Sequence, residues 1–203
     1  MSYGGTTMHL IGIAGPSCSG KTTIARLLAE AMDAPLLHLD RYWIEGCHKP
    51  VVAGHPSYER PHQYDSDAMR TDACEAMRSS STVVVEGFLL FSNPWFARNC
   101  TTRIFLDVPY ERLAARRRAR HGASLDDVVG GRAVEADAGW AAHGRSEWDL
   151  FGAWQRDIED MVIVSRREDG GSWPDHPAGI VAELGARLNH VIVECDRLVM
   201  PAR

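Results

Sequence analysis

The chain has 203 residues, enough for a single domain of ordinary size with a substantial core. Lys and Arg number 22 against 27 Asp and Glu, and a chain with a net charge of −5 is a poor general binder of nucleic acid or of an anionic membrane surface. The five cysteines form no CxxC pair and no apolar run is long enough to span a membrane, so we expect no zinc site, no disulfide framework and a reduced, cytoplasmic setting.

Short apolar runs alternate with segments of helical periodicity along the chain. The apolar runs predict strands at residues 8–14, 36–39, 82–85 and 103–108. The helical patterns lie at residues 22–32, 66–77, 110–120, 147–161 and 178–188. Two further runs, 161–164 and 190–194, are ambiguous between a strand and a helix end. This alternation predicts one α/β domain over residues 1–203, with a parallel sheet of about five strands covered by helices on both faces.

Two stretches interrupt the alternation. Residues 41–62 contain two glycines and three prolines, which predicts a long loop. Residues 121–145 contain five glycines, which suggests a mobile segment within a lid at about residues 112–145. Long loops inside a compact domain are usually functional or disordered. Three histidines lie in the first stretch or at its end, but their spacing is too loose to favour a metal site.

The segment GIAGPSCSGKTT, residues 12–23, joins the first predicted strand to the first predicted helix. Its Gly15-x-x-x-x-Gly20-Lys21-Thr22 spacing matches a phosphate-binding P-loop in the required strand–helix context. The glycines let backbone N–H groups turn toward phosphate oxygens, and the helix N-terminus adds partial positive charge. We expect Lys21 to reach the β- and γ-phosphates of ATP and Thr22 to bind Mg²⁺. The predicted ATP-binding residues of the loop are Gly15, Ser17, Cys18, Ser19, Gly20, Lys21, Thr22 and Thr23.

Two acidic residues end predicted strands next to this loop. Asp40 follows the second apolar run and Glu86 the third, and ligands bind at the carboxyl ends of parallel strands. Asp40 is the candidate general base for an acceptor hydroxyl. Glu86 is the candidate Mg²⁺ ligand and a competing candidate for the base. Helix capping or plain solvation is the alternative for both, and Asp107 is better explained as a structural cap.

An arginine-rich run, YERLAARRRAR, covers residues 110–120. On a helix, Arg116 and Arg120 share a face, and Arg117 lies about 100° around the axis. Guanidinium groups can neutralise a transferring phosphoryl group and help a closing lid to exclude water. A solvated helix face, a nucleic-acid patch and partners for the surplus acids remain alternatives, although the aromatic residues expected of an RNA-binding patch are missing.

No Asn-Lys-x-Asp motif for reading guanine occurs in the chain, which argues against a GTPase. The chain is also short for a motor or transporter with appended domains. A P-loop phosphotransferase with a three-layer fold therefore remains the favoured class.

Six ordered segments together resemble the uridine kinase, phosphoribulokinase and nicotinamide riboside kinase group, and most of all the nicotinamide riboside kinases. The segments are GPSCSGKTT, HLDRYW, HQYDSDAM, VVVEGFLLF, IFLDVPYERLAARRRAR and EWDLFGAWQRDIEDM. The resemblance implies a kinase that moves the γ-phosphate of ATP, with Mg²⁺, to the 5′-hydroxyl of a ribonucleoside. Nicotinamide riboside is the leading acceptor, followed by uridine or cytidine.

The resemblance also implies roles for particular residues. Asp40 would lie near the acceptor hydroxyl, with Tyr42 and Trp43 in the aromatic pair that follows it. Tyr64 would stack on the base, and Asp65 would bind ribose hydroxyls. Further residues would serve the lid, with Arg117 on the ribose side and Arg116 and Arg120 near the phosphates. Glu86 stands at the position of the acidic residue that precedes a glycine in this group. From the residues alone, Asp65 could equally be a helix N-cap, and Tyr42 and Trp43 could be loop packing.

The chain departs from this group in three places. His121-Gly122 stands where the group places an aromatic residue after its last lid arginine, the segment GCHKPVVAGHPSYERP is unlike its acceptor loop, and the chain from residue 165 onward shows little resemblance. These departures keep two alternatives open. One is a kinase of another small hydroxyl metabolite, and the other is a non-catalytic ATP-binding switch that acts on a partner.

Overall fold

The computed structural model describes residues 8–122, 132–158, 160–165, 178–184 and 186. Its main feature is a parallel sheet of five strands in the order β2-β5-β1-β6-β7. The strands are β1 (His9–Ala14), β2 (Leu36–His38), β5 (Thr82–Gly87), β6 (Thr102–Asp107) and β7 (Met161–Ser165). All four pairings are parallel, which confirms the predicted sheet and resolves residues 161–164 as strand. The second ambiguous run, 190–194, lies outside the described residues.

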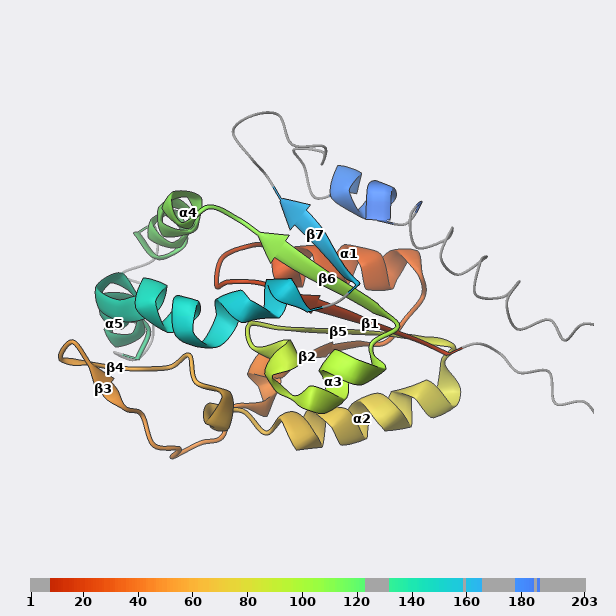
Figure 1. Cartoon of the computed structure of the whole chain (residues 1–203), viewed down its shortest axis with the longest axis horizontal. Coiled ribbons are helices and arrows are strands. Elements are labelled where there is room, and N and C mark those ends of the chain that lie inside the picture. The colour runs from red at the N-terminus through yellow and green to blue at the C-terminus, as the bar shows by residue number, and fades with distance from the viewer. Residues whose placement is uncertain (1–7, 123–131, 159, 166–177, 185, 187–203) are drawn as a thin grey trace, which may run out of the picture.

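Helices cover both faces of this sheet and extend past one of its ends (Figure 1). The α-helices are α1 (Lys21–Ala31), α2 (Ser66–Ser79), α3 (Pro94–Asn99), α4 (Tyr110–Gly122) and α5 (Arg132–Glu147). Residues 178–184 are also helical, as predicted for 178–188 within the described part. Short 3-10 segments are η1 (Leu39–Tyr42), η2 (Pro61–Gln63), η3 (Leu90–Ser92) and η5 (Ala153–Asp157), and Trp148–Gly152 forms a π-helical turn, η4.

Alternation along the strands produces two separate hydrophobic layers. Ile11, Val84 and Ile104 pack with α1 and with residues 180–184 on one face of the sheet. Their neighbours in sequence, including Leu10 and Phe105, pack with α2, α3 and η3 on the opposite face. Because successive side chains of a strand point to opposite faces, one apolar run supplies both layers. The result is the predicted three-layer α/β architecture.

Several elements lie beyond the carboxyl ends of the strands. Helices α4 and α5 and the small hairpin of β3 (Val51–Val52) and β4 (His55–Pro56) gather beyond this end of the sheet (Figure 1). The hairpin lies inside the stretch predicted as an irregular loop, and α5 packs against β4. The loop between β1 and α1 opens at the same end.

Two expectations about the later part of the chain differ in part from the structure. The glycine-rich stretch 121–145 was expected to interrupt the regular elements, but its residues 132–145 belong to α5, where Gly144 gives room to the ring of Trp140. Residues 147–161 were expected to be helical. Met161 instead begins β7, and residues 148–157 are helical as the π-helical turn η4 and the 3-10 segment η5. There the ring of Trp148 fills the space in which Gly152 would carry a Cβ. In both places, tertiary packing overrides local propensity.

Gly87, which ends β5, provides a test of the packing behind the site. A Cβ on this residue would lie 2.5 Å from the Cβ of Leu39, the residue before Asp40. We therefore expect Gly87→Ala to lower the free energy of unfolding by about 1–3 kcal/mol, because the overpacked core must shift η1. Chemical denaturation measures the loss. Ser81→Ala, an exposed change before the same strand, serves as the control, and equal stability of the two variants would contradict the close packing.

Candidate active site

The loop between β1 and α1 forms a concave stretch of backbone. Cys18 and Gly20 adopt φ values of 65° and 102°, in the left-handed region that this turn requires. A Cβ on Gly15 would lie 2.8 Å from the carbonyl oxygen of Leu106, so no side chain fits there. Lys21 is buried, and its Nζ donates to the carbonyl of Pro16 at 3.0 Å. The loop is therefore folded tightly around the lysine.

Hydrogen-bonding groups of this loop are left for a ligand. No side chain among the described residues caps the N-terminus of α1, and the Oγ of Ser19 is buried without a hydrogen-bond partner in that part of the chain. An uncapped helix N-terminus presents N–H donors and partial positive charge to an anion. The donors, the lysine and the orphaned hydroxyl fit the phosphate groups of a nucleotide.

A hydroxyl, a carboxylate and an imidazole meet beside the loop. The Oγ1 of Thr22 donates to Oε1 of Glu86 at 3.0 Å, and the Nδ1 of His38 lies 2.8 Å from the same oxygen. The parallel register pairs Glu86 with His38 across β5 and β2, which explains this contact. Hydroxyl and carboxylate oxygens are suitable ligands for Mg²⁺, so the donor set fits the metal. The sequence did not single out His38, because a lone histidine on a short strand is a weak signal.

Asp40 lies in η1, directly after β2, at the same end of the sheet. Its side chain reaches solvent, yet enough protein surrounds the carboxyl group that desolvation raises its pKa. Lys21 opposes this shift and Glu86 adds to it, so Asp40 lies within electrostatic range of both the loop and the Thr22–Glu86 pair. A carboxylate with a raised pKa is a better proton acceptor than an ordinary one.

Two arginines of α4 reach the loop. The Nη1 of Arg116 donates to the carbonyls of Cys18 at 3.2 Å and Ser19 at 3.0 Å. The Nη1 of Arg117 donates to the Oγ of Ser17 at 3.1 Å, and its guanidinium carbon lies 4.9 Å from the ring centre of Trp140. The structure therefore brings both arginines to the phosphate-binding loop. Arg120 is part of α4, but its side chain lies outside the described residues.

Three aromatic rings form a cluster between η1 and the segment before α2. The rings of Trp43 and Tyr64 are 5.3 Å apart with planes at 85°, and Tyr58 lies 5.9 Å from Trp43. The hydroxyl of Tyr64 donates to the carbonyl of Tyr58 at 3.3 Å, and burial raises the pKa of Tyr64, with Asp40 contributing to the shift. Trp43 and Tyr64, which the resemblance placed at the acceptor, therefore lie together near Asp40.

Two other expected substrate residues have structural partners instead. The hydroxyl of Tyr42 donates to Oδ2 of Asp72 on α2 at 2.7 Å, and its ring packs against the core on that side. Asp65 accepts the N–H of Ala68 at 2.9 Å and thereby caps the N-terminus of α2. These contacts favour the packing and capping roles that the residues alone left open.

A buried polar network links the stretch before η2 to α5, and the sequence did not reveal it. The Nε of Arg60 donates to Oε1 of Glu147 at 2.8 Å, and Nδ1 of His143 lies 2.8 Å from the other carboxylate oxygen. Beside this pair, Oε2 of Glu59 is buried with no hydrogen-bond partner among the described residues. Burial raises the pKa of Glu59 to about 7, against a lowering by Arg117. Arg60 and Glu147 are 87 residues apart, so local patterns carry no trace of the contact.

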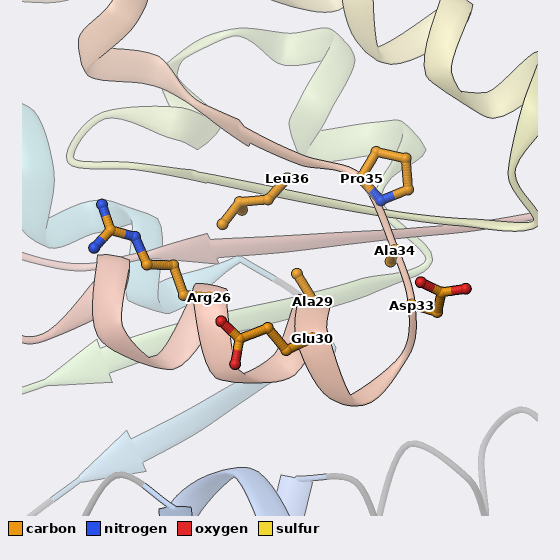
Figure 2. A pocket seen from close by; sticks show the side chains of 7 residues that line it. All are labelled: Arg26, Ala29, Glu30, Asp33, Ala34, Pro35 and Leu36. Carbon is orange, nitrogen blue, oxygen red and sulfur yellow. The ribbon is translucent and has the colours of Figure 1, made fainter.

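A separate hollow of about 540 Å³ lies at the other end of the sheet, where α1 ends and β2 begins (Figure 2). Its lining residues are Arg26, Ala29, Glu30, Asp33, Ala34, Pro35 and Leu36. Its charged side chains are exposed and sit away from the strand ends that carry the loop, so it is unsuited to phosphate chemistry.

Within the described residues, no helix is long and apolar enough to cross a membrane.

The parallel sheet, the glycine loop that closes on Lys21 and the Thr22–Glu86 contact together define a P-loop protein of the α/β class. The chain belongs to the AAA domain family, which matches residues 11–129, more than half of its length.

The relatives that the chain matches are kinases of small molecules. It is 26% identical over 155 residues to a uridine kinase of Chloroflexus aurantiacus, covering 63% of this chain and 72% of that protein. It is 28% identical over 182 residues to shikimate kinase 2 of Escherichia fergusonii, covering 88% and 91%. A gluconokinase structure from Sinorhizobium meliloti 1021 aligns over 95% of this chain and 98% of that one, with a TM-score of 0.57 and 19% identity, which shows the shared fold. These relatives support a phosphotransferase that acts on a small molecule.

The hydroxyl of Tyr42 can be removed as a test of its structural role. Because it bonds Asp72 at the surface of α2, we expect Tyr42→Phe to change the free energy of unfolding by about 1 kcal/mol or less and to leave the KM for any acceptor unchanged. Steady-state kinetics with an active acceptor would measure this. A tenfold rise in the acceptor KM would restore Tyr42 to the substrate site.

Glu59 makes a second prediction, on the pH dependence of stability. Because its pKa is raised from 4.5 to about 7, the protein holds this proton more tightly when folded, and stability is lost as pH rises through the folded value. Glu59→Gln has no titrating group at this position, so its stability should not show this loss. The free energy of unfolding of the variant, relative to that of wild type, should therefore rise by about 2–3 kcal/mol between pH 5 and pH 8.5.

Urea denaturation at both pH values measures this difference. Glu75→Gln, an exposed carboxylate on α2, is the matched control and should follow wild type at each pH. A pH-independent difference between Glu59→Gln and wild type would show that Glu59 is ionised in the folded protein at low pH.

Proposed function

We propose that the protein is an ATP- and Mg²⁺-dependent kinase that transfers the γ-phosphoryl group to a hydroxyl of a small molecule. The observation that carries the proposal is the contact of Thr22 with Glu86 at 3.0 Å, beside a phosphate-binding loop and within electrostatic range of Asp40. Kinases of this class need positioning and charge neutralisation more than covalent chemistry, and these residues supply both.

The loop side of the site holds the nucleotide. Lys21 exchanges its contact with the carbonyl of Pro16 for the β- and γ-phosphates, while the N-terminal amides of α1 and the Oγ of Ser19 bind phosphate oxygens. Thr22 and Glu86 are the residues that would hold Mg²⁺, and His38 fixes the orientation of the carboxylate. The metal, when bound, neutralises negative charge on the phosphates.

Asp40 serves as the proton acceptor for the acceptor hydroxyl. The hydroxyl oxygen forms a bond to the γ-phosphorus, the bond from that phosphorus to the bridging oxygen breaks, ADP leaves, and the hydroxyl proton passes to Asp40. The raised pKa of Asp40 favours this transfer. Glu86 is less suited to the role, because Thr22 and His38 both contact the same carboxylate oxygen.

The lid arginines of α4 complete the phosphate side. Arg116 and Arg117 already contact backbone and hydroxyl groups of the loop, so a small shift would transfer their donors to phosphate oxygens. Positive charge placed there stabilises the transferring group. Arg120 is a further candidate on the same helix.

A ribonucleoside, phosphorylated on its 5′-hydroxyl, is the acceptor that we favour. The relatives named uridine kinase support uridine, and the cluster of Trp43 and Tyr64 offers rings against which a base can pack. Cytidine and nicotinamide riboside are the next acceptors to test. Nicotinamide riboside rests on the resemblance of sequence segments alone.

A kinase of another hydroxyl metabolite is the second candidate. The match to a shikimate kinase over 88% of this chain supports it, as does the small hairpin of β3 and β4 in the acceptor loop. The same P-loop chemistry serves both candidates, so only the acceptor distinguishes them.

Substitutions at the two ends of the transfer test the proposed chemistry. Lys21→Ala should lower acceptor-dependent ADP release by about 10²-fold or more, because one cationic donor to the phosphates is lost. Asp40→Asn should lower kcat by about 10²–10⁴-fold and leave the binding of an ATP analogue intact, because only proton acceptance is removed.

Arg26→Ala, on the exposed side of the same helix as Lys21, is the matched control and should retain full activity. Circular dichroism would establish that each variant is folded. Wild-type turnover in folded Lys21→Ala and Asp40→Asn proteins would rule out the proposed mechanism, and tight ATP binding without a phosphorylated product from any acceptor would favour a switch protein.

A further inference from the structure

Glu59 is a half-buried acidic residue for which the proposed phosphotransfer has no use. Its Oε2 is buried and has no hydrogen-bond partner among the described residues. A buried carboxylate oxygen without a donor is unfavourable, and such atoms in native proteins usually have a functional explanation. The missing donor is therefore a property of the site that calls for a ligand.

The position of Glu59 is fixed by its neighbours. Gln63, fully buried, donates to the carbonyl of Ser57 at 2.7 Å and accepts the N–H of Arg60 at 3.0 Å. Arg60 in turn donates to Glu147 on α5 at 2.8 Å, and its guanidinium group lies 4.5 Å from the ring centre of Phe151. The backbone on both sides of Glu59 is therefore anchored.

Glu59 lies near the reaction centre. It is within electrostatic range of Lys21 and Asp40, and also of Arg117 and Glu147. Arg117 has its own contacts, because it donates to Ser17 and packs on Trp140. The neighbours of Glu59 in sequence are Tyr58, whose ring lies 5.9 Å from that of Trp43, and Arg60, which bonds α5. Glu59 therefore lies close to the aromatic cluster beside Asp40, where an acceptor molecule would sit.

The groups around this space specify the chemistry of the acceptor. Asp40 and Glu59 accept hydrogen bonds and repel negative charge, and the lysine on this side is committed to the phosphates. Hydroxyl groups supply the donor that Glu59 lacks and can also donate to Asp40. The acceptor should therefore be rich in hydroxyls and carry no anionic group.

We propose that the acceptor is a polyhydroxylated molecule without an anionic group and that Glu59 determines this specificity by accepting a hydrogen bond from a hydroxyl other than the one phosphorylated. The proposal rests on the proposed kinase function and narrows its substrate class. It separates this chain from a kinase of hydroxy acids such as shikimate or gluconate, whose carboxylate groups would meet Asp40 and Glu59 while Lys21 and Arg117 serve the phosphates.

An acceptor panel tests the proposal in the full-length protein. ADP release and the phosphorylated product are measured with Mg²⁺ and ATP for uridine, cytidine and ribose, and for shikimate and gluconate. Wild type should phosphorylate at least one neutral acceptor and neither acid. Glu59→Gln should raise the KM for that acceptor by about tenfold or more, because a charge-assisted hydrogen bond is lost, and the KM for ATP should not change.

Two further variants make the result specific. Glu59→Ala should raise the acceptor KM at least as much as Glu59→Gln, which retains the shape and part of the hydrogen-bonding capacity of the side chain. Glu45→Gln, an exposed carboxylate in the same stretch, should leave every constant unchanged. Thermal unfolding with and without acceptor provides a second readout, since the neutral acceptor should stabilise wild type more than either Glu59 variant.

The outcomes distinguish the specificity proposal from the proposed kinase function. Phosphorylation of shikimate or gluconate, or an unchanged acceptor KM in folded Glu59 variants, would overturn the specificity proposal and leave the kinase function standing. No phosphorylated product from any acceptor, in a protein that binds ATP, would overturn the kinase function and the specificity proposal with it.

Discussion

The parallel register of β2, β5 and β1 is the constraint on which the site depends. It pairs Ile13 with Glu86 and Glu86 with His38, so the strand that leads into the phosphate-binding loop lies directly beside the strand that carries the acid. Gly87 then allows Leu39 to pack closely, and Asp40 follows at the same end of the sheet. A shift of one residue in this register would turn Glu86 toward the opposite face and separate it from Thr22.

The distribution of charge follows from this geometry. Cations serve the phosphate side, where Lys21 is buried in the loop and Arg116 and Arg117 reach it from α4. Carboxyl groups serve the other side, and burial raises the pKa of Asp40 and of Glu59. In the proposed mechanism, a site with this polarity holds a polyanionic donor at one end and an acceptor without an anionic group at the other. The proposed nucleotide site is compatible with a net acidic chain because its positive charge is local.

Local sequence patterns predicted the parts of the fold that depend on periodicity. Four of the five strands, α1, α2 and α4 follow from short apolar runs and helical spacing, and the loop spacing predicted the position of Lys21. The errors lie where distant residues decide. Helix α5 forms through a glycine-containing stretch because Trp140 stacks on Tyr110 at 5.2 Å. The contact of Arg60 with Glu147 and the bond from Tyr42 to Asp72 likewise join residues that are far apart in the chain, so local patterns do not reveal them.

The central claim is that the P-loop transfers phosphate to a small hydroxyl compound, and an unbiased product search tests it most directly. The protein would be incubated with a metabolite extract, Mg²⁺ and ATP labelled with heavy oxygen in its γ-phosphate, and products would be identified by mass spectrometry. The account predicts that a polyhydroxylated metabolite gains one labelled phosphoryl group with wild type and none with Lys21→Ala. Labelled inorganic phosphate as the sole product, or an identical product pattern for both proteins, would contradict it.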